Sequence, residues 1–137
     1  MRGINKKEKN LKIIISNYLK ELGIPANIKG YYCLRFGIME VMRDMSLASQ
    51  ITKRLYPIIA EKFNTTPSKA ERNIRHAIET GRMRANEDMV TEIFSYSTSA
   101  LKGKPTNSEF IATVADYILM THDVLVQEGE TDETMQI

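Results

Sequence analysis

The chain has 137 residues, a length typical of one domain, with 19 basic and 17 acidic residues. Its single cysteine, Cys33, excludes an internal disulfide and favours a reducing compartment. No apolar run reaches the roughly 18 residues of a membrane span, and the start, MRGINKKEKN, lacks a signal-peptide core. We therefore expect a cytoplasmic protein without a membrane partner.

The acidic residues are unevenly distributed. Residues 121–137 contain five of them and no Lys or Arg, so residues 1–120 carry 19 basic against 12 acidic residues, a net charge of +7. A basic body favours a polyanionic partner, although ordinary solubility charge is the alternative. We expect a helical domain over residues 1–126 and an acidic, disordered tail over 127–137.

The first half of the chain has helical periodicity. Apolar residues recur at three- and four-residue steps from Leu11 to Leu22, which predicts an amphipathic helix that Gly23 ends. A second helix, rich in aromatic residues and Met, is predicted over residues 27–43. A third is predicted over 47–63, kinked or restarted at Pro57, with these residues facing inward: Leu47, Ile51, Leu55, Ile58, Ile59 and Phe63.

The fourth helix, over about 67–82, has two possible starts: Thr66 as cap with Pro67 in first position, or a capping box of Ser68 and Glu71. Asn86 caps a short fifth helix. A polar loop follows, and Thr106 with Glu109 is predicted to start a sixth helix with the buried stripe Ile111, Val114, Ala115, Ile118 and Leu119. No segment alternates like a strand, so the prediction is a compact, all-α, six-helix domain.

A helix-turn-helix is predicted over about residues 51–80. Ala60 and Ala70 are small and inward-facing, and Asn64 tolerates the left-handed conformation that a tight turn needs. Two helices that cross steeply require small residues at their contact and a turn of three or four residues. An ordinary helical hairpin would also satisfy this spacing.

The fourth helix has a charged outer side. At 100° per residue, an apolar side contains Ala70, Ile74, Ala77, Ile78 and Gly81, and the opposite side contains Ser68, Arg72, Arg75, His76 and Glu79, flanked by Lys69 and Arg82. Arg can bind guanine bidentately and Glu can accept from the cytosine amino group, while Ser68 and Lys69 suit phosphates. The alternative is a solvated face with pairs such as Glu71–Arg75.

The loop LKGKPTNSEF is a second candidate site. Lys102 and Lys104 precede a helix start at which Thr106, Asn107 and Ser108 can cap, and this combination can bind an anion. A solvent-exposed loop with an ordinary cap is the alternative.

The sequence does not predict an enzyme, a cofactor or a metal site. His76 and His122 lie 46 residues apart, and Cys33 has no partner at metal-ligand spacing. The segment KGKP lacks the strand and the spacing of a phosphate-binding loop.

Four stretches carry a family resemblance: GIPANIKGYY (23–32), ITKRLYP (51–57), IAEKFNTTPSKAERNIRHAIE (59–79) and KGKPTNSEFIATVAD (102–116). The chain resembles the effector domain of the stage zero sporulation protein A family, the response regulators that start sporulation in spore-forming Firmicutes. The similarity covers about residues 11–120.

The resemblance implies a six-helix fold in which the third and fourth helices form the helix-turn-helix. It implies sequence-specific binding of double-stranded DNA at TGTCGAA-like boxes, often by head-to-tail pairs, and hence association with the nucleoid. Glu71, Arg72 and Arg75 become base-reading residues. The expected contact strip also includes Ser68, Lys69 and His76, and the expected backbone contacts are Lys104 and the helix start Thr106–Ser108.

The chain departs from the family in several places. The family's receiver domain is absent, which leaves a fragment or a free-standing effector as expectations. Lys69 stands where the family usually has Arg, which keeps the positive charge but loses the bidentate hydrogen bonding of a guanidinium. Asn73 stands where a small apolar residue is usual. Residues 80–88, TGRMRANED, replace a Trp-containing segment where the family engages RNA polymerase sigma factor, so sigma factor is the less favoured partner. The alternative function is a receiver-less interaction module that modulates a related full-length regulator.

Overall fold

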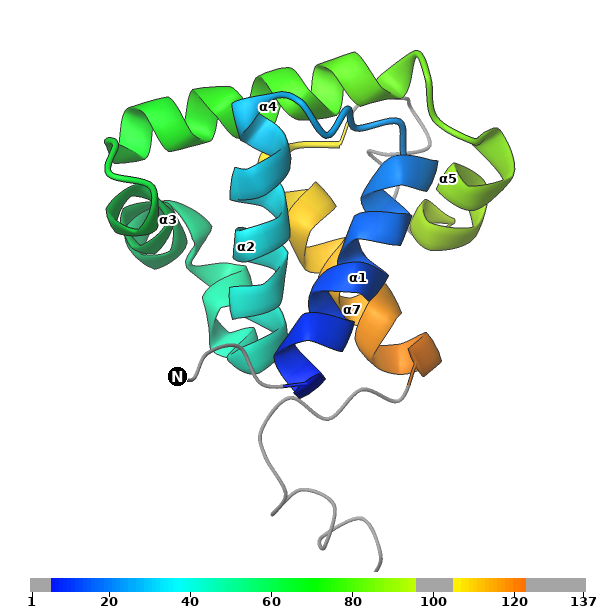
Figure 1. Cartoon of the computed structure of the whole chain (residues 1–137), viewed down its shortest axis with the longest axis horizontal. Coiled ribbons are helices and arrows are strands. Elements are labelled where there is room, and N and C mark those ends of the chain that lie inside the picture. Colours follow the sequence, from blue (N-terminus) through cyan, green and yellow to red (C-terminus); the bar gives the residue numbers. More distant parts are fainter. Residues whose placement is uncertain (1–5, 96–104, 123–137) are drawn as a thin grey trace, which may run out of the picture.

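The computed structural model describes residues 6–95 and 105–122 (Figure 1). Within these ranges it contains six α-helices and no strand, which confirms the all-α prediction. The predicted tail from residue 127 lies outside the described residues. The α-helices are α1 (Lys6–Glu21), α2 (Lys29–Arg43), α3 (Tyr56–Lys62), α4 (Pro67–Arg82), α5 (Glu87–Phe94) and α7 (Asn107–His122).

The end of α1 is fixed by Gly23, as predicted. Its φ of 81° lies in the left-handed region, where a side chain is disfavoured. The amide of Gly23 donates to the carbonyl of Lys20, and that of Ile24 donates to the carbonyl of Leu19, each at 2.9 Å. This pair of bonds is a Schellman motif, which satisfies the last carbonyl groups and turns the chain toward α2.

Three successive helical pieces cover the predicted third helix over 47–63, so this stretch is not one continuous helix, while the predicted restart at Pro57 is confirmed. A 3-10 helix, η1 (Met45–Ser49), and a π-helix, η2 (Ile51–Leu55), precede α3. Pro57 lies in the first turn of α3. Because proline has no amide hydrogen, Pro57 cannot donate the bond that would continue η2, which ends at Leu55 and is followed by α3 from Tyr56.

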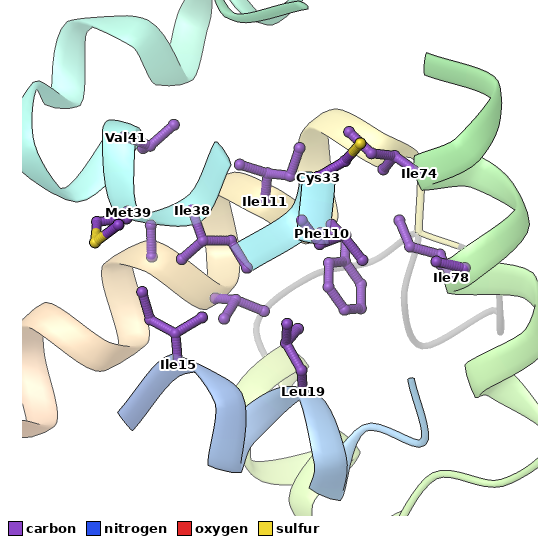
Figure 2. Close-up of a cluster of buried hydrophobic side chains, with 14 of the residues drawn as sticks. Ile15, Leu19, Cys33, Ile38, Met39, Val41, Ile74, Ile78, Phe110 and Ile111 are labelled. Carbon is purple, nitrogen blue, oxygen red and sulfur yellow. The ribbon is translucent and has the colours of Figure 1, made fainter. Parts of the chain in front are cut away.

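The core joins four helices around a common apolar centre. The helices α1, α2 and α7 lie beside one another, and α4 crosses one end of the group (Figure 1). Figure 2 shows side chains of α1, α2, α4 and α7 converging, among them Ile15, Ile38, Ile74 and Ile111. Each of these isoleucines is 0% exposed, so α4 is anchored on the core by its apolar side.

The contact between α2 and α4 depends on a glycine. A Cβ atom added to Gly30 would lie 2.6 Å from the Cβ of Ala77, inside any normal contact distance, and would also collide with the carbonyl group of Asn73. The absence of a side chain at Gly30 therefore lets the start of α2 approach the backbone of α4 closely.

Candidate nucleic-acid interface

Helix α4 lies along one edge of the molecule (Figure 1). Its inward residues are fully buried, in agreement with the predicted helical faces: Ala70, Ile74, Ala77, Ile78 and Gly81. On the opposite side Ser68, Arg72, His76 and Glu79 are exposed. One strip of the helix is thus packed against α2 and α3, and the other faces outward.

The turn before α4 sets its direction. Asn64 has a φ of 55°, and the amide of Thr65 donates to the carbonyl of Ala60 at 2.9 Å, which closes a second Schellman motif. Thr66 Oγ1 then accepts from the amide of Lys69 at 3.1 Å, with Pro67 in the first turn. The Thr66 start is therefore the one adopted, and α3 and α4 are joined by four residues, as a helix-turn-helix requires.

The six predicted contact residues of α4 share one continuous surface. Ser68, Lys69, Arg72, Arg75 and His76 are exposed, while Glu71 is half-buried beside them. We call these six residues the α4 strip. The structure therefore brings together the side chains that the sequence placed on one side of the helix. Their contact with DNA stays a prediction.

Glu71 and Arg75 form an ion pair one turn apart, with side chains 37% and 48% exposed. The hydrogen bond from Arg75 to Glu71, together with the negative charge of that carboxylate, raises the pKa of Arg75. Because both side chains are more than one-third exposed, water and salt screen the pair, and breaking it costs little. The alternative interpretation of a charged solvated face therefore applies to this pair but does not prevent it from contacting a ligand.

Arg72, unlike Arg75, has no carboxylate partner in the part of the chain that the structure describes. Among the described residues, no carboxylate lies within ion-pair distance of Arg72, and none lies within that distance of Lys69. Both side chains are exposed. These two cations at the start of α4 are therefore available to an anionic partner.

The start of α7 lies next to the α4 strip. Thr106 Oγ1 accepts from the amide of Glu109 at 3.1 Å, and Glu109 accepts from the amide of Thr106 at 2.9 Å, so the predicted capping box is formed. A groove of about 440 Å³ separates this start from α4, and its lining includes Arg75, Arg82, Thr106 and Ser108. Lys102 and Lys104 lie outside the described residues.

Asn107 has an internal role that the sequence did not predict. Its side-chain amide donates to the hydroxyl of Tyr56 at 3.0 Å and to the backbone carbonyl of Glu71 at 3.1 Å. Both donor hydrogens are thereby used within the protein. Asn107 thus links α7 to α3 and α4 and positions the start of α7 beside the α4 strip.

A second groove flanks α4 on its other side, and sequence analysis missed it. Its lining joins the start of α2 to the turn and includes Lys29, Tyr32, Phe63 and Lys69. Phe63, predicted to face inward, is 38% exposed instead. The basic residues of α2 are visible in the sequence as possible anion contacts. Their place in this groove is not, because only the packing of α2 on α4 brings Lys29 close to Lys69.

Residues 6–95 and 105–122 contain neither a candidate membrane span nor a candidate metal site. No helix there is long and apolar enough to cross a membrane, and no group of three or more His, Cys, Asp or Glu side chains there could hold a metal ion.

An all-α fold that presents a capped, basic helix after a four-residue turn has the arrangement of a helix-turn-helix DNA-binding domain. The chain matches the family described as "Sporulation initiation factor Spo0A C terminal" over residues 15–118, and it belongs to that family. This confirms the resemblance inferred from the sequence. Membership identifies a DNA-binding domain of the sporulation-regulator type, a family of binding domains rather than a class of enzymes.

Proposed function

We propose that this domain recognises a short TGTCGAA-like box in double-stranded DNA by placing the first turns of α4 in the major groove. The observation that carries the proposal is the α4 strip, which faces outward on a helix anchored by five buried residues. Helix-turn-helix proteins use the corresponding part of their second helix for base contacts.

The proposed base-reading residues are Glu71, Arg72 and Arg75. Arg72 and Arg75 can each bind the O6 and N7 atoms of guanine, and Glu71 can accept from a cytosine amino group. The pairing of Glu71 with Arg75 supports this assignment, because a carboxylate one turn away restricts the guanidinium to a smaller set of orientations.

The remaining contacts are proposed for the phosphate backbone or for atoms near the bases. Ser68, Lys69 and His76 would act from α4. The start of α7 would contribute Thr106 and Ser108, with Asn107 supporting it from inside. Lys102 and Lys104 would add charge to this second contact. Such contacts position the protein on the duplex and carry no sequence information.

Paired boxes would be occupied by two copies arranged head to tail, and binding to chromosomal DNA would place the protein at the nucleoid. RNA polymerase sigma factor, the less favoured partner, would meet the segment after α4, where Met83 is 90% exposed. A receiver-less module that modulates a related full-length regulator is the second candidate, supported by this same exposed methionine.

Fluorescence anisotropy with labelled duplexes tests the proposal. We expect tighter binding to a TGTCGAA duplex than to a scrambled one, with a steep dependence on salt. Arg75→Ala should weaken binding to the box more than to the scrambled duplex, whereas Lys104→Ala should weaken both equally and reduce the salt slope by about one. If the folded protein binds neither duplex at low salt, the interaction-module function is supported instead.

A further inference from the structure

The groove between α2 and α4 has the size and composition of a binding surface. Its volume is about 770 Å³, and we call it the α2–α4 groove. It contains no acidic side chain, and its lining residues are Lys29, Tyr32, Cys33, Phe63, Asn64, Thr65, Lys69, Arg72 and Asn73. Three cations and two aromatic rings thus share one concave surface.

The cations of the α2–α4 groove are not neutralised. Among the described residues, no carboxylate lies within ion-pair distance of Lys29, Lys69 or Arg72. Other arginines of the domain do have such partners, as Arg43 does with Glu8 at 3.4 Å. A concave surface that concentrates positive charge in this way attracts an anionic ligand.

The two aromatic rings that line the α2–α4 groove, those of Tyr32 and Phe63, are partly exposed, and each packs against a neighbouring ring. Tyr32 is 43% exposed and Phe63 is 38% exposed. The ring of Tyr32 packs edge-on against Tyr31 with centroids 5.1 Å apart, and that of Phe63 packs edge-on against Phe36 at 5.8 Å. These contacts leave part of each ring open to the solvent, where it can pack against an apolar surface such as a sugar.

The α2–α4 groove is continuous with the α4 strip, because Lys69 and Arg72 belong to both. We infer that one sugar–phosphate strand of the bound duplex, just outside the box, lies in this groove. Lys29 and Lys69 bind its phosphates, and Tyr32 and Phe63 pack against its deoxyribose rings. This inference rests on the proposed function and extends the interface to α2.

A contact with the sugar–phosphate strand should change the salt dependence of binding but not the preference for the box. Neutralising one phosphate releases a counterion, so each contact adds about 0.9 to the slope of log affinity against log salt. Because the sugar–phosphate strand is the same for every sequence, the contact strengthens binding to any duplex and leaves discrimination between bases unchanged.

Lys29→Gln tests the inference, with Lys9→Gln as the matched control. Lys9 is an exposed residue of α1, which begins at the end of the molecule away from α4 (Figure 1). We expect Lys29→Gln to weaken binding to the box and to a scrambled duplex by the same factor, about three- to tenfold, and to lower the salt slope by about 0.9. Lys9→Gln should change neither quantity.

Two further measurements separate the possible outcomes. Replacing the flanking phosphates one at a time with neutral methylphosphonates should identify positions at which Lys29→Gln no longer has an effect. If Lys29→Gln behaves like Lys9→Gln while the wild type still prefers the box, the inference fails and the proposed function stands. If dAMP at millimolar concentration shifts the NMR signals of Tyr32 and Phe63 and duplex DNA does not, the groove takes free nucleotides and the inference is overturned.

Discussion

The side-chain amide of Asn107, the first residue of α7, donates a 3.0 Å hydrogen bond to the hydroxyl of Tyr56, the first residue of α3. The same amide donates to the carbonyl of Glu71 in α4. Tyr56 is 6% exposed, and its burial is the main cause that raises the pKa of its hydroxyl. One side chain thus connects the start of α7 with both helices of the helix-turn-helix.

We expect Asn107→Ala to lower the free energy of unfolding by about 1–3 kcal/mol, because it leaves a mostly buried hydroxyl without its donor. It should also weaken binding to all duplexes, since the start of α7 would no longer be held beside the α4 strip. Urea denaturation measures the first effect and anisotropy the second.

Tyr56→Phe is the matched variant for this contact. It removes the hydroxyl but keeps the bond from Asn107 to the carbonyl of Glu71, so DNA affinity should be largely retained. If Asn107→Ala weakens binding to the box alone, Asn107 reads bases directly, and the positioning role described above is wrong.

Glu71→Gln should separate two proposed effects of the Glu71 carboxylate, its repulsion of the DNA backbone and its recognition of a base. Losing the carboxylate removes a negative charge from the α4 strip, so affinity for scrambled DNA should rise severalfold. Discrimination at the base pair read by Glu71 should fall, because a neutral amide can donate as well as accept. Binding to boxes substituted at each position measures both effects. Unchanged discrimination at every position would remove Glu71 from the base-reading set.

Local sequence rules predicted the parts of this interface that depend on backbone geometry. Asn64 adopts the left-handed conformation that its residue type tolerates, and Thr66 caps α4, which is one of the two helix starts that the sequence left open. The inward spine of α4 followed from helical periodicity, since Ala70 and Ile74 repeat at the helical spacing. Apart from the choice between these two starts, each feature could be derived without knowing the position of any other helix.

Features that depend on several helices were not predicted. Asn107 looked like a cap residue open to an anion, and only the approach of α7 to α3 and α4 directs its amide inward. Phe63 fitted the apolar pattern of one long helix, but the chain already leaves α3 at this position, so its ring lies at the surface against Phe36. Hydrophobic periodicity does not show where tertiary packing ends a helix.

Gly30→Ala should destabilise the domain by about 1–3 kcal/mol, since the added methyl group would collide with Ala77 and the backbone of Asn73. Gly37→Ala is the control within the same helix. Its Cβ would lie 3.0 Å from Cδ1 of Ile59, the movable end of a side chain, and alanine favours a helix by up to about 1 kcal/mol over glycine. Urea denaturation should therefore show a loss for Gly30→Ala and little change for Gly37→Ala. Equal losses would contradict the proposed close contact of α2 with α4.

Alkaline pH should destabilise the contact between α5 and α7. The hydroxyl of Tyr117 donates to the carboxylate of Glu92, and this bond is the main cause that raises the pKa of Tyr117 to about 12. Between pH 10, the ordinary tyrosine value, and pH 12, the folded protein keeps a proton that the unfolded chain loses. The stabilisation is therefore complete below pH 10 and disappears as the pH rises through 12. NMR titration of the Tyr117 ring should give the raised pKa, and Glu92→Gln should lower it. A wild-type Tyr117 that titrates like an exposed tyrosine would show that this hydrogen bond does not persist in solution.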